Sequence, residues 1–297
     1  MVKILDFNLT PYYPKEGNGL EELIRFPDSE FKRENIPNGT VWVFNPSNHR
    51  FDQSILSNDV GCGMAAFIIS PVDPVKSADM IYEYLNGKNI LGRGNHFVDI
   101  CSRISNRYLE SKPHNILILH SDGKSIDDST PDSIEEAVKK QALAEKFREE
   151  LGYKLSEIIG ATPRILGNWT HNSVEYDKGR IIYRKGAIKI TSERLHLITG
   201  NLGTKVWFYT VDGSDVPPLC SMPHGTGRRG PRGDTKVSLK DASELRKMVH
   251  IPAGISDSSL RTEHPSCYNN FNNIINNLGD YIVSMGTSVI LSYVGKT

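Results

Sequence analysis

The chain has 297 residues, and its 35 lysine and arginine residues balance 35 aspartate and glutamate residues, which excludes a histone-like polycation. No apolar run approaches the roughly 18 residues that span a bilayer, and the N-terminus lacks the basic and apolar regions of a secretory signal. Four cysteines without a CxxC pair do not make a disulfide framework, so we expect a cytosolic, reducing location.

Helical and strand-like patterns alternate along the chain without an internal repeat or a long linker. Strands are expected at residues 40–44, 63–70 and 116–119, with helices at 77–85 and 133–159. Further short strands are expected at 180–184, 187–191, 195–198, 206–211 and 289–294, with helices at 241–249 and 268–278. The pattern predicts a single α+β domain with mixed strands over residues 1–297.

Four of the nine histidines lie in unusual contexts, although a lone histidine is more often a surface or core residue. His96 lies in Gly-Asn-His-Phe, His120 ends an apolar strand, His171 follows Trp-Thr, and His224 lies in His-Gly-Thr-Gly-Arg. Upstream, the segment Asp-Val-Gly-Cys-Gly places a carboxylate and a thiol three residues apart. Carboxylate, thiolate and imidazole ligands suit a divalent metal, and a thiolate can bridge two ions.

Common short motifs are absent or incomplete. Gly123-Lys-Ser resembles the end of a phosphate-binding P-loop, but the glycine required five residues earlier is Ile118. The segment that starts at Gly92 lacks the third glycine of a dinucleotide fingerprint, and no HExxH or GxSxG motif occurs.

The motifs together resemble the RtcB family, the GTP-dependent RNA-splicing ligases. The resemblance extends from about Asp59 to the C-terminus and rests on eight motifs in order: Asp59-Val-Gly-Cys-Gly-Met, Gly94-Asn-His-Phe, His120-Ser, His171-Asn, Arg184-Lys-Gly-Ala, Gly200-Asn-Leu-Gly, His224-Gly-Thr-Gly-Arg and Lys296. It implies an RtcB-type fold and cytoplasmic RNA repair or tRNA splicing.

The resemblance also implies roles for particular residues. Cys62 would bridge two Mn²⁺ ions, with His96 and His120 on one ion and Asp59 and His171 on the other. His224 would carry GMP covalently, since an imidazole can attack the α-phosphate of GTP. The residues matched to nucleotide binding are Asn95, Asp99, Gly200, Asn201, Gly225, Gly227, Arg228, Tyr268 and Lys296.

The implied reaction joins RNA ends. GMP would pass from His224 to an RNA 3′-phosphate, and a 5′-hydroxyl would then seal the strand and release GMP; a 2′,3′-cyclic phosphate would first be opened by hydrolysis. Two alternatives remain open: an enzyme that only caps 3′-phosphate ends, and a non-catalytic module that binds metal, nucleotide and RNA. The sequence identifies neither an accessory activator nor the physiological RNA, and it indicates no membrane partner.

Two segments are locally basic. Residues 177–194 contain six lysine or arginine residues against two acidic ones, and residues 227–250 contain seven against three. Beside phosphate-handling motifs, this favours contact with an RNA backbone. Glu175, Arg184 and Lys185 are weaker candidates for the phosphate path, and exposed strand residues are an equally good interpretation.

The chain also departs from the family pattern. It is short, and its N-terminal region, residues 1–58, lacks the M-P-D-V-H signature found upstream in the family. Asp99 replaces a glutamate, Asn201 lies in a Thr-Gly-Asn-Leu-Gly segment where P-G-S-M-G is usual, and His120 is followed by Ser-Asp-Gly-Lys-Ser. None of these changes removes a matched metal ligand or His224, so they affect the expected substrate more than the chemistry.

Overall fold

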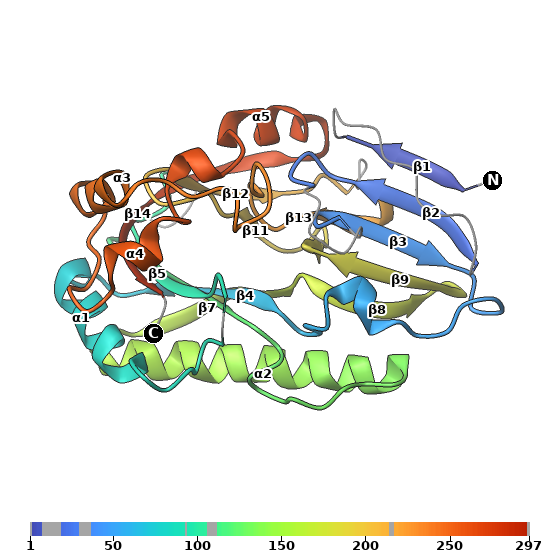
Figure 1. Ribbon diagram of the computed structural model, residues 1–297, viewed down its shortest axis with the longest axis horizontal. Helices are drawn as coiled ribbons and strands as arrows, with labels where there is room; N and C mark the ends of the chain where they lie inside the picture. The colour runs from blue at the N-terminus through green and yellow to red at the C-terminus, as the bar shows by residue number, and fades with distance from the viewer. Residues whose placement is uncertain are drawn as a thin grey trace.

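The computed structural model describes residues 2–7, 19–29, 37–92, 94–105, 112–213 and 217–295. Most of the described strands belong to two large sheets that lie side by side (Figure 1). The first sheet has the order β1-β2-β3-β9-β8, with β1 (Lys3–Asp6), β2 (Leu20–Arg25), β3 (Thr40–Phe44), β8 (Asn172–Asp177) and β9 (Arg180–Lys185). Its pairs are antiparallel except for β1 with β2.

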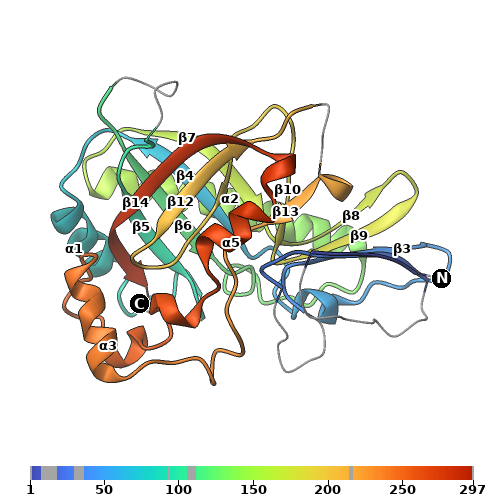
Figure 2. The same cartoon turned by 90° about the horizontal axis from the view of Figure 1, so that it is seen from above.

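The second sheet has seven antiparallel strands. Its order is β11-β12-β14-β5-β6-β4-β7, with β4 (Gly63–Ile69), β5 (Phe97–Cys101), β6 (Asn115–Ser121), β7 (Pro163–Thr170), β11 (His196–Ile198), β12 (Lys205–Thr210) and β14 (Val283–Gly295). Figure 2 shows the long β14 crossing the molecule beside β12 and β5. A two-stranded ribbon of β10 (Ala187–Lys189) and β13 (Ser221–Pro223) lies between the sheets.

The helices are few and mostly short. They are α1 (Pro74–Leu85), α2 (Ile134–Ile158), α3 (Leu239–Glu244), α4 (Asp257–Leu260) and α5 (Phe271–Asn276), with 3-10 turns at Gln53–Leu56, Pro218–Cys220, Leu245–Lys247, Pro265–Cys267 and Gly279–Tyr281. Among the described residues, none of the helices is long and apolar enough to cross a membrane.

The long helix α2 packs against both large sheets. It begins after Ser133, whose side chain accepts a hydrogen bond from the Glu136 amide and so caps the helix. The helix contacts β4, β6 and β7 of the second sheet and β8 of the first, and in Figure 1 it runs beneath both. Its apolar side chains, including Leu151 and Leu155, cover one face of the second sheet.

The strands of the second sheet are apolar on both faces because both faces are covered. On β6, Ile116 and Ile118 belong to the core cluster that is shared with Val41 and Ile182 of the first sheet. Leu117, one position along, instead packs with α1 and α2. Side chains alternate between faces along a strand. His120 has the parity of Ile118 and therefore points to the inner face, between the sheets.

Most expected elements are confirmed, and the α+β class with them. The expected helix at 268–278 is shorter than predicted: α5 begins at Phe271, because Asn270 caps it, and Tyr268 lies before it in extended backbone. The expected helix at 241–249 is displaced toward the N-terminus and ends in a 3-10 turn. The sequence analysis did not predict β2, β5, β7 or β8, and β14 is longer than the segment 289–294.

Candidate active site

One cavity of about 580 Å³ opens between the inner faces of the two sheets. Every residue that the sequence analysis proposed for metal, nucleotide or GMP binding lines it, apart from Lys296, which lies outside the described residues. Residues separated by more than two hundred positions in sequence, such as Asp59 and Tyr268, therefore line the same cavity.

The metal-ligand candidates meet because they lie at neighbouring strand ends. Cys62 immediately precedes β4, His96 precedes β5, His120 is near the end of β6, and His171 lies between β7 and β8. In the sheet β6 pairs with both β4 and β5, and β4 also pairs with β7. The His171 amide donates to the Cys62 carbonyl oxygen across 2.9 Å, which fixes the two segments together.

The side chains converge on the Cys62 sulfur. The Nε2 atoms of His96, His120 and His171 lie 3.6, 3.5 and 3.2 Å from Sγ of Cys62. The ligand atoms of Cys62, His96 and His120 all lie within 4.8 Å of one another, so this buried triplet could hold a metal ion. One thiol with several imidazole nitrogens is a donor set that suits a divalent transition metal. The residues present therefore fit a metal.

Asp59 lies at the edge of this cluster. Its Oδ1 accepts a hydrogen bond of 2.9 Å from the Gly123 amide, and it lines the cavity next to Cys62. Asp59 and His171 are not members of the triplet around Cys62, His96 and His120.

Burial determines the protonation of the cluster. It lowers the pKa of His120 well below the ordinary value, with His96 adding to the effect, and it does the same for His171 with His224 adding. Burial together with the Asp59 carboxylate raises the pKa of the Cys62 thiol. The two imidazoles are thus neutral, as metal ligands must be, whereas a metal has to displace a proton from the thiol.

Arg148 of α2 holds the segments that carry Cys62 and His171 in position. Its guanidinium is fully buried and donates to the Gly61 carbonyl oxygen at 2.6 Å, to Thr170 Oγ1 at 2.9 Å and to Asn168 Oδ1 at 2.9 Å. Gly61 and Thr170 directly precede Cys62 and His171. A single side chain therefore fixes both ligand-bearing segments. Its charge also lowers the pKa of Cys62, opposing the effect of burial.

His224 follows β13 and lies on the cavity wall near the metal-ligand candidates. The centroid of its ring is 4.2 Å from that of His171 and 6.5 Å from that of His120. Its Nδ1 lies 2.7 Å from the Gly186 carbonyl oxygen. A carbonyl oxygen only accepts hydrogen bonds, so Nδ1 carries the proton and Nε2 of the neutral ring carries the lone pair. The hydrogen bond fixes both tautomer and orientation.

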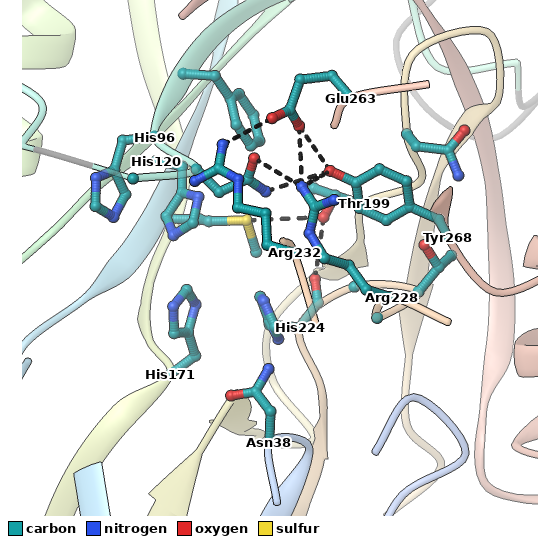
Figure 3. Close-up of a pocket in the computed structure, with 18 of the residues that line it drawn as sticks. Asn38, His96, His120, His171, Thr199, His224, Arg228, Arg232, Glu263 and Tyr268 are labelled. Carbon is teal, nitrogen blue, oxygen red and sulfur yellow. Dashed lines mark hydrogen bonds and ion pairs between the residues drawn. The ribbon is translucent and has the colours of Figure 1, made fainter. Parts of the chain in front are cut away.

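On the opposite side of the cavity, polar groups surround the buried carboxylate of Glu263 (Figure 3). It accepts from Arg228 at 3.3 Å, from Arg232 at 2.9 Å and from the Tyr268 hydroxyl at 2.7 Å. The side-chain amide of Asn95 also faces this carboxylate, and with its nitrogen turned toward Glu263 it donates to both oxygens, at 3.1 and 2.7 Å. The Arg228 guanidinium also lies over the Tyr268 ring, 4.4 Å from its centroid.

The loop after His224 requires glycine at two places. Gly225 forms a parallel bridge with Thr199, which brings the loop against the segment containing Gly200 and Asn201. Gly227 has φ +65°, and a Cβ there would lie 2.2 Å from the Asp28 carbonyl oxygen. The close approach to Asp28 means that the N-terminal region packs directly on this loop.

Asp99 is a buried carboxylate at the back of the cavity. It lies on β5, and its Oδ1 has no hydrogen-bond partner among the described residues. Burial, with a smaller contribution from the nearby Glu263 carboxylate, raises its pKa well above the ordinary value. The cavity thus offers a polar group that a ligand donor would satisfy.

The structure corrects the three weaker candidates. Arg184 is buried and bonds to Glu175 Oε1 at 2.7 Å, to Ser221 Oγ and to the Leu219 carbonyl oxygen. Lys185 is fully buried. Arg184 and Lys185 are therefore not exposed strand residues, and neither of them lines the cavity, because β9 is covered on both faces and Arg184 takes part in an internal ion pair.

Several polar residues that line the cavity were not predicted from the sequence, and Glu263, Arg232 and Asn38 are among them. Glu263 and Arg232 form the polar cluster with Arg228, and an acidic residue just before the Pro265-Ser-Cys-Tyr segment was the available signal for Glu263. Asn38, from the turn before β3, lies below His171 and His224 in Figure 3. No residue pattern in the N-terminal region pointed to it.

A comparison with protein families agrees with this arrangement. The family model described as tRNA-splicing ligase RtcB matches residues 136–288, about half of the chain. A search of curated proteins gave no match. The matched segment contains His171, His224, Arg228, Glu263 and Tyr268, whereas Cys62, Asn95, His96 and His120 lie upstream of it.

Proposed function

Because the chain belongs to the RtcB family, we propose that it is a GTP-dependent RNA ligase that joins 3′-phosphate or 2′,3′-cyclic phosphate ends to 5′-hydroxyl ends. The observation that carries the proposal is the hydrogen bond from His224 Nδ1 to the Gly186 carbonyl oxygen, inside a cavity that also holds the Cys62 cluster. It fixes the tautomer of the neutral ring, in which Nδ1 carries the proton and Nε2 carries the lone pair.

The first step is attack by His224 Nε2 on the α-phosphorus of GTP. A nitrogen–phosphorus bond forms, the bond from that phosphorus to the bridging oxygen breaks, and pyrophosphate leaves with the electron pair. The Gly186 carbonyl oxygen accepts the hydrogen bond from Nδ1, so it orients the ring and stabilises the positive charge that develops on it. Gly225 and Gly227 let the loop backbone come close to phosphoryl oxygens.

In the second step an oxygen of the RNA 3′-phosphate attacks the phosphorus of the His224 adduct. The nitrogen–phosphorus bond breaks, the electron pair returns to Nε2, and GMP becomes joined to the RNA end. In the third step a 5′-hydroxyl attacks the RNA phosphorus, loses its proton, and displaces GMP. Each step transfers one phosphoryl group, so positioning and charge stabilisation account for most of the catalysis.

We propose that Asp59, Cys62, His96, His120 and His171 hold two Mn²⁺ ions. When bound, such ions would neutralise phosphate charge and orient the reacting groups. The neutral state of His120 and His171 supports this assignment. On the other side of the cavity, we propose that Asn95, Arg228 and Tyr268 bind the guanosine nucleotide; their hydrogen bonds with Glu263 and with one another support this assignment.

Strand sealing tests the proposal. Labelled RNA with a 3′-phosphate is incubated with a 5′-hydroxyl RNA, GTP and Mn²⁺, and the products are separated on a denaturing gel. We expect a joined strand with the wild type and with His250→Ala, because His250 pairs with Asp79 away from the cavity. His224→Ala should give none. RNA that gains GMP at its 3′ end but never joins would show a capping enzyme, and no GMP transfer would contradict the proposal.

A further inference from the structure

A second hollow of about 620 Å³ adjoins the cavity and is separated from it by Asn201 and Tyr268, which line both. We call it the side groove. It is formed by the segment Gly203–Lys205, by Arg229, and by the residues that lead into α5. Neighbouring residues divide between the two spaces: Arg228 lines the cavity, and Arg229 lines the side groove.

The side groove is electropositive. Lys205 and Arg229 are exposed cations, and the described residues that line the groove include no carboxylate. Arg229 Nε donates to the Tyr268 carbonyl oxygen at 2.9 Å, which holds the guanidinium in place. Neither cation forms an ion pair with a described residue. Their charge is therefore available to an anionic ligand, in contrast to Arg184, which is already paired with Glu175.

The remaining surface of the groove is apolar or amide-bearing. Val289 is 46% exposed there, beside the half-buried ring of Phe271, and Asn272 adds an exposed amide. Sites for single-stranded nucleic acid typically combine cations that contact the phosphate backbone with apolar and aromatic surface on which the bases pack. A small anion alone would not require the apolar surface.

Asn201 provides a second, independent observation at the point where the two spaces meet. The residue is only 7% exposed, and its Oδ1 has no hydrogen-bond partner among the described residues. A buried acceptor without a partner is costly, by about 1–3 kcal/mol, unless a ligand supplies a donor. Ribose hydroxyls are such donors.

We infer that the side groove holds a single RNA strand and leads it into the cavity, with Lys205 and Arg229 on its phosphates and Asn201 at the entrance. The identity of the strand as RNA rests on the proposed ligase function. The basic segment 227–250 thus contributes to RNA binding through Arg229, whereas the basic segment 177–194 provides the buried side chains of Arg184 and Lys185.

The test measures the fluorescence anisotropy of labelled single-stranded RNA at several salt concentrations. One RNA carries a 3′-phosphate, and a second carries 5′- and 3′-hydroxyl ends. The double variant Lys205→Ala/Arg229→Ala is compared with the wild type and with Lys139→Ala/Lys146→Ala. The control removes two exposed cations from α2, which Figure 1 shows on the opposite side of the molecule from α5.

We expect the groove variant to bind about tenfold more weakly near 0.1 M salt, and its salt slope to fall by about 1.4, because each single-strand phosphate contact contributes about 0.7. The control should match the wild type. If the groove variant binds only the 3′-phosphate RNA more weakly, the groove holds the strand with the 3′-phosphate. If it binds only the hydroxyl RNA more weakly, the groove holds the strand with the 5′-hydroxyl. Lys205→Glu, at an exposed position, should weaken binding further than Lys205→Ala.

Labelling of the protein with GMP separates this inference from the proposed function. The groove variant should take up GMP from GTP as the wild type does, because neither cation lines the cavity. If the wild type takes up no GMP, the ligase proposal fails while the binding comparison still stands. The groove assignment would be overturned if the groove variant bound both RNAs with the same affinity and salt slope as the control variant. It would also be overturned if the groove variant lost GMP labelling to the same extent as RNA binding.

Discussion

His224 Nδ1 and the Gly186 carbonyl oxygen lie 2.7 Å apart, although the two residues belong to different strand connections. Gly186 separates β9 from β10, and His224 follows β13, the partner of β10. The two-stranded ribbon therefore determines where the proposed nucleophile lies. Because a backbone carbonyl is the acceptor, no side-chain substitution at position 186 would remove the bond directly, and the ring keeps one tautomer.

The loop after His224 gives the first prediction. Gly227→Ala should lower the free energy of unfolding by about 1–3 kcal/mol, because φ +65° is unfavourable for alanine and the new Cβ would collide with the Asp28 carbonyl oxygen. GMP labelling should fall with it. Gly230→Ala is the matched control, since its nearest neighbour would be a methyl group at 3.5 Å. Urea unfolding measures the stability of both variants. Equal stability of Gly227→Ala and Gly230→Ala would be evidence against the close contact of Gly227 with Asp28.

The second prediction concerns metal binding. Saturating Mn²⁺ should raise the melting temperature of the wild type, since a ligand bound only by the folded state at a hundred times its Kd adds about 2.7 kcal/mol. Cys62→Ala should lose this shift. Cys101→Ala is the control, because Cys101 is also buried but lies in the apolar core. A shift that survives Cys62→Ala would place the metal elsewhere.

Arg148 is predicted to position the metal ligands. Arg148→Ala should reduce the free energy of unfolding by at least about 1–3 kcal/mol, because it leaves buried acceptors such as the Gly61 carbonyl oxygen without a donor. Under conditions where the variant is folded, the stabilisation by Mn²⁺ should also shrink. The exposed Arg103 provides the comparison as Arg103→Ala, which should change neither quantity. A stable variant with unaltered metal binding would contradict the positioning role.

Asp99 predicts a dependence of stability on pH. Its folded-state pKa is raised, so the carboxyl group binds a proton more tightly in the folded protein than in the unfolded chain. Its contribution to stability is complete below the unfolded pKa and is lost as the pH rises through the folded pKa. Asp99→Asn should flatten this part of the curve and raise stability at neutral pH. An unchanged pH profile in the variant would show that Asp99 does not titrate there.

The residues that line the cavity were easier to predict from the sequence than the order of the strands. Short motifs such as Asp59-Val-Gly-Cys-Gly carry their chemistry locally, so their residues were recognisable before their positions in space were known. Their convergence depends on the pairing of β6 with β4 and β5, and residue patterns do not specify which strands become neighbours. Strands with few apolar residues on one face, such as β8, gave too weak a pattern to be predicted.

The errors have a common physical cause. Arg184 and Lys185 were weak candidates for a phosphate path, with exposed strand residues as the alternative, because charged residues are usually exposed; both are buried, Arg184 in an ion pair with Glu175. Glu263 was missed for the related reason that its partners, Arg228 and Arg232, are distant in sequence. Asn38 reaches the cavity from the N-terminal region only because that region packs against the His224 loop.

The most direct test of the central claim is to locate GMP on the protein. The wild type is incubated with GTP and Mn²⁺, digested near neutral pH because a phosphorus–nitrogen bond is acid-labile, and its peptides are sequenced by mass spectrometry. The account predicts GMP on His224, with no adduct in His224→Ala and a normal adduct in His250→Ala. GMP on Lys296, or an adduct that persists in His224→Ala, would contradict it.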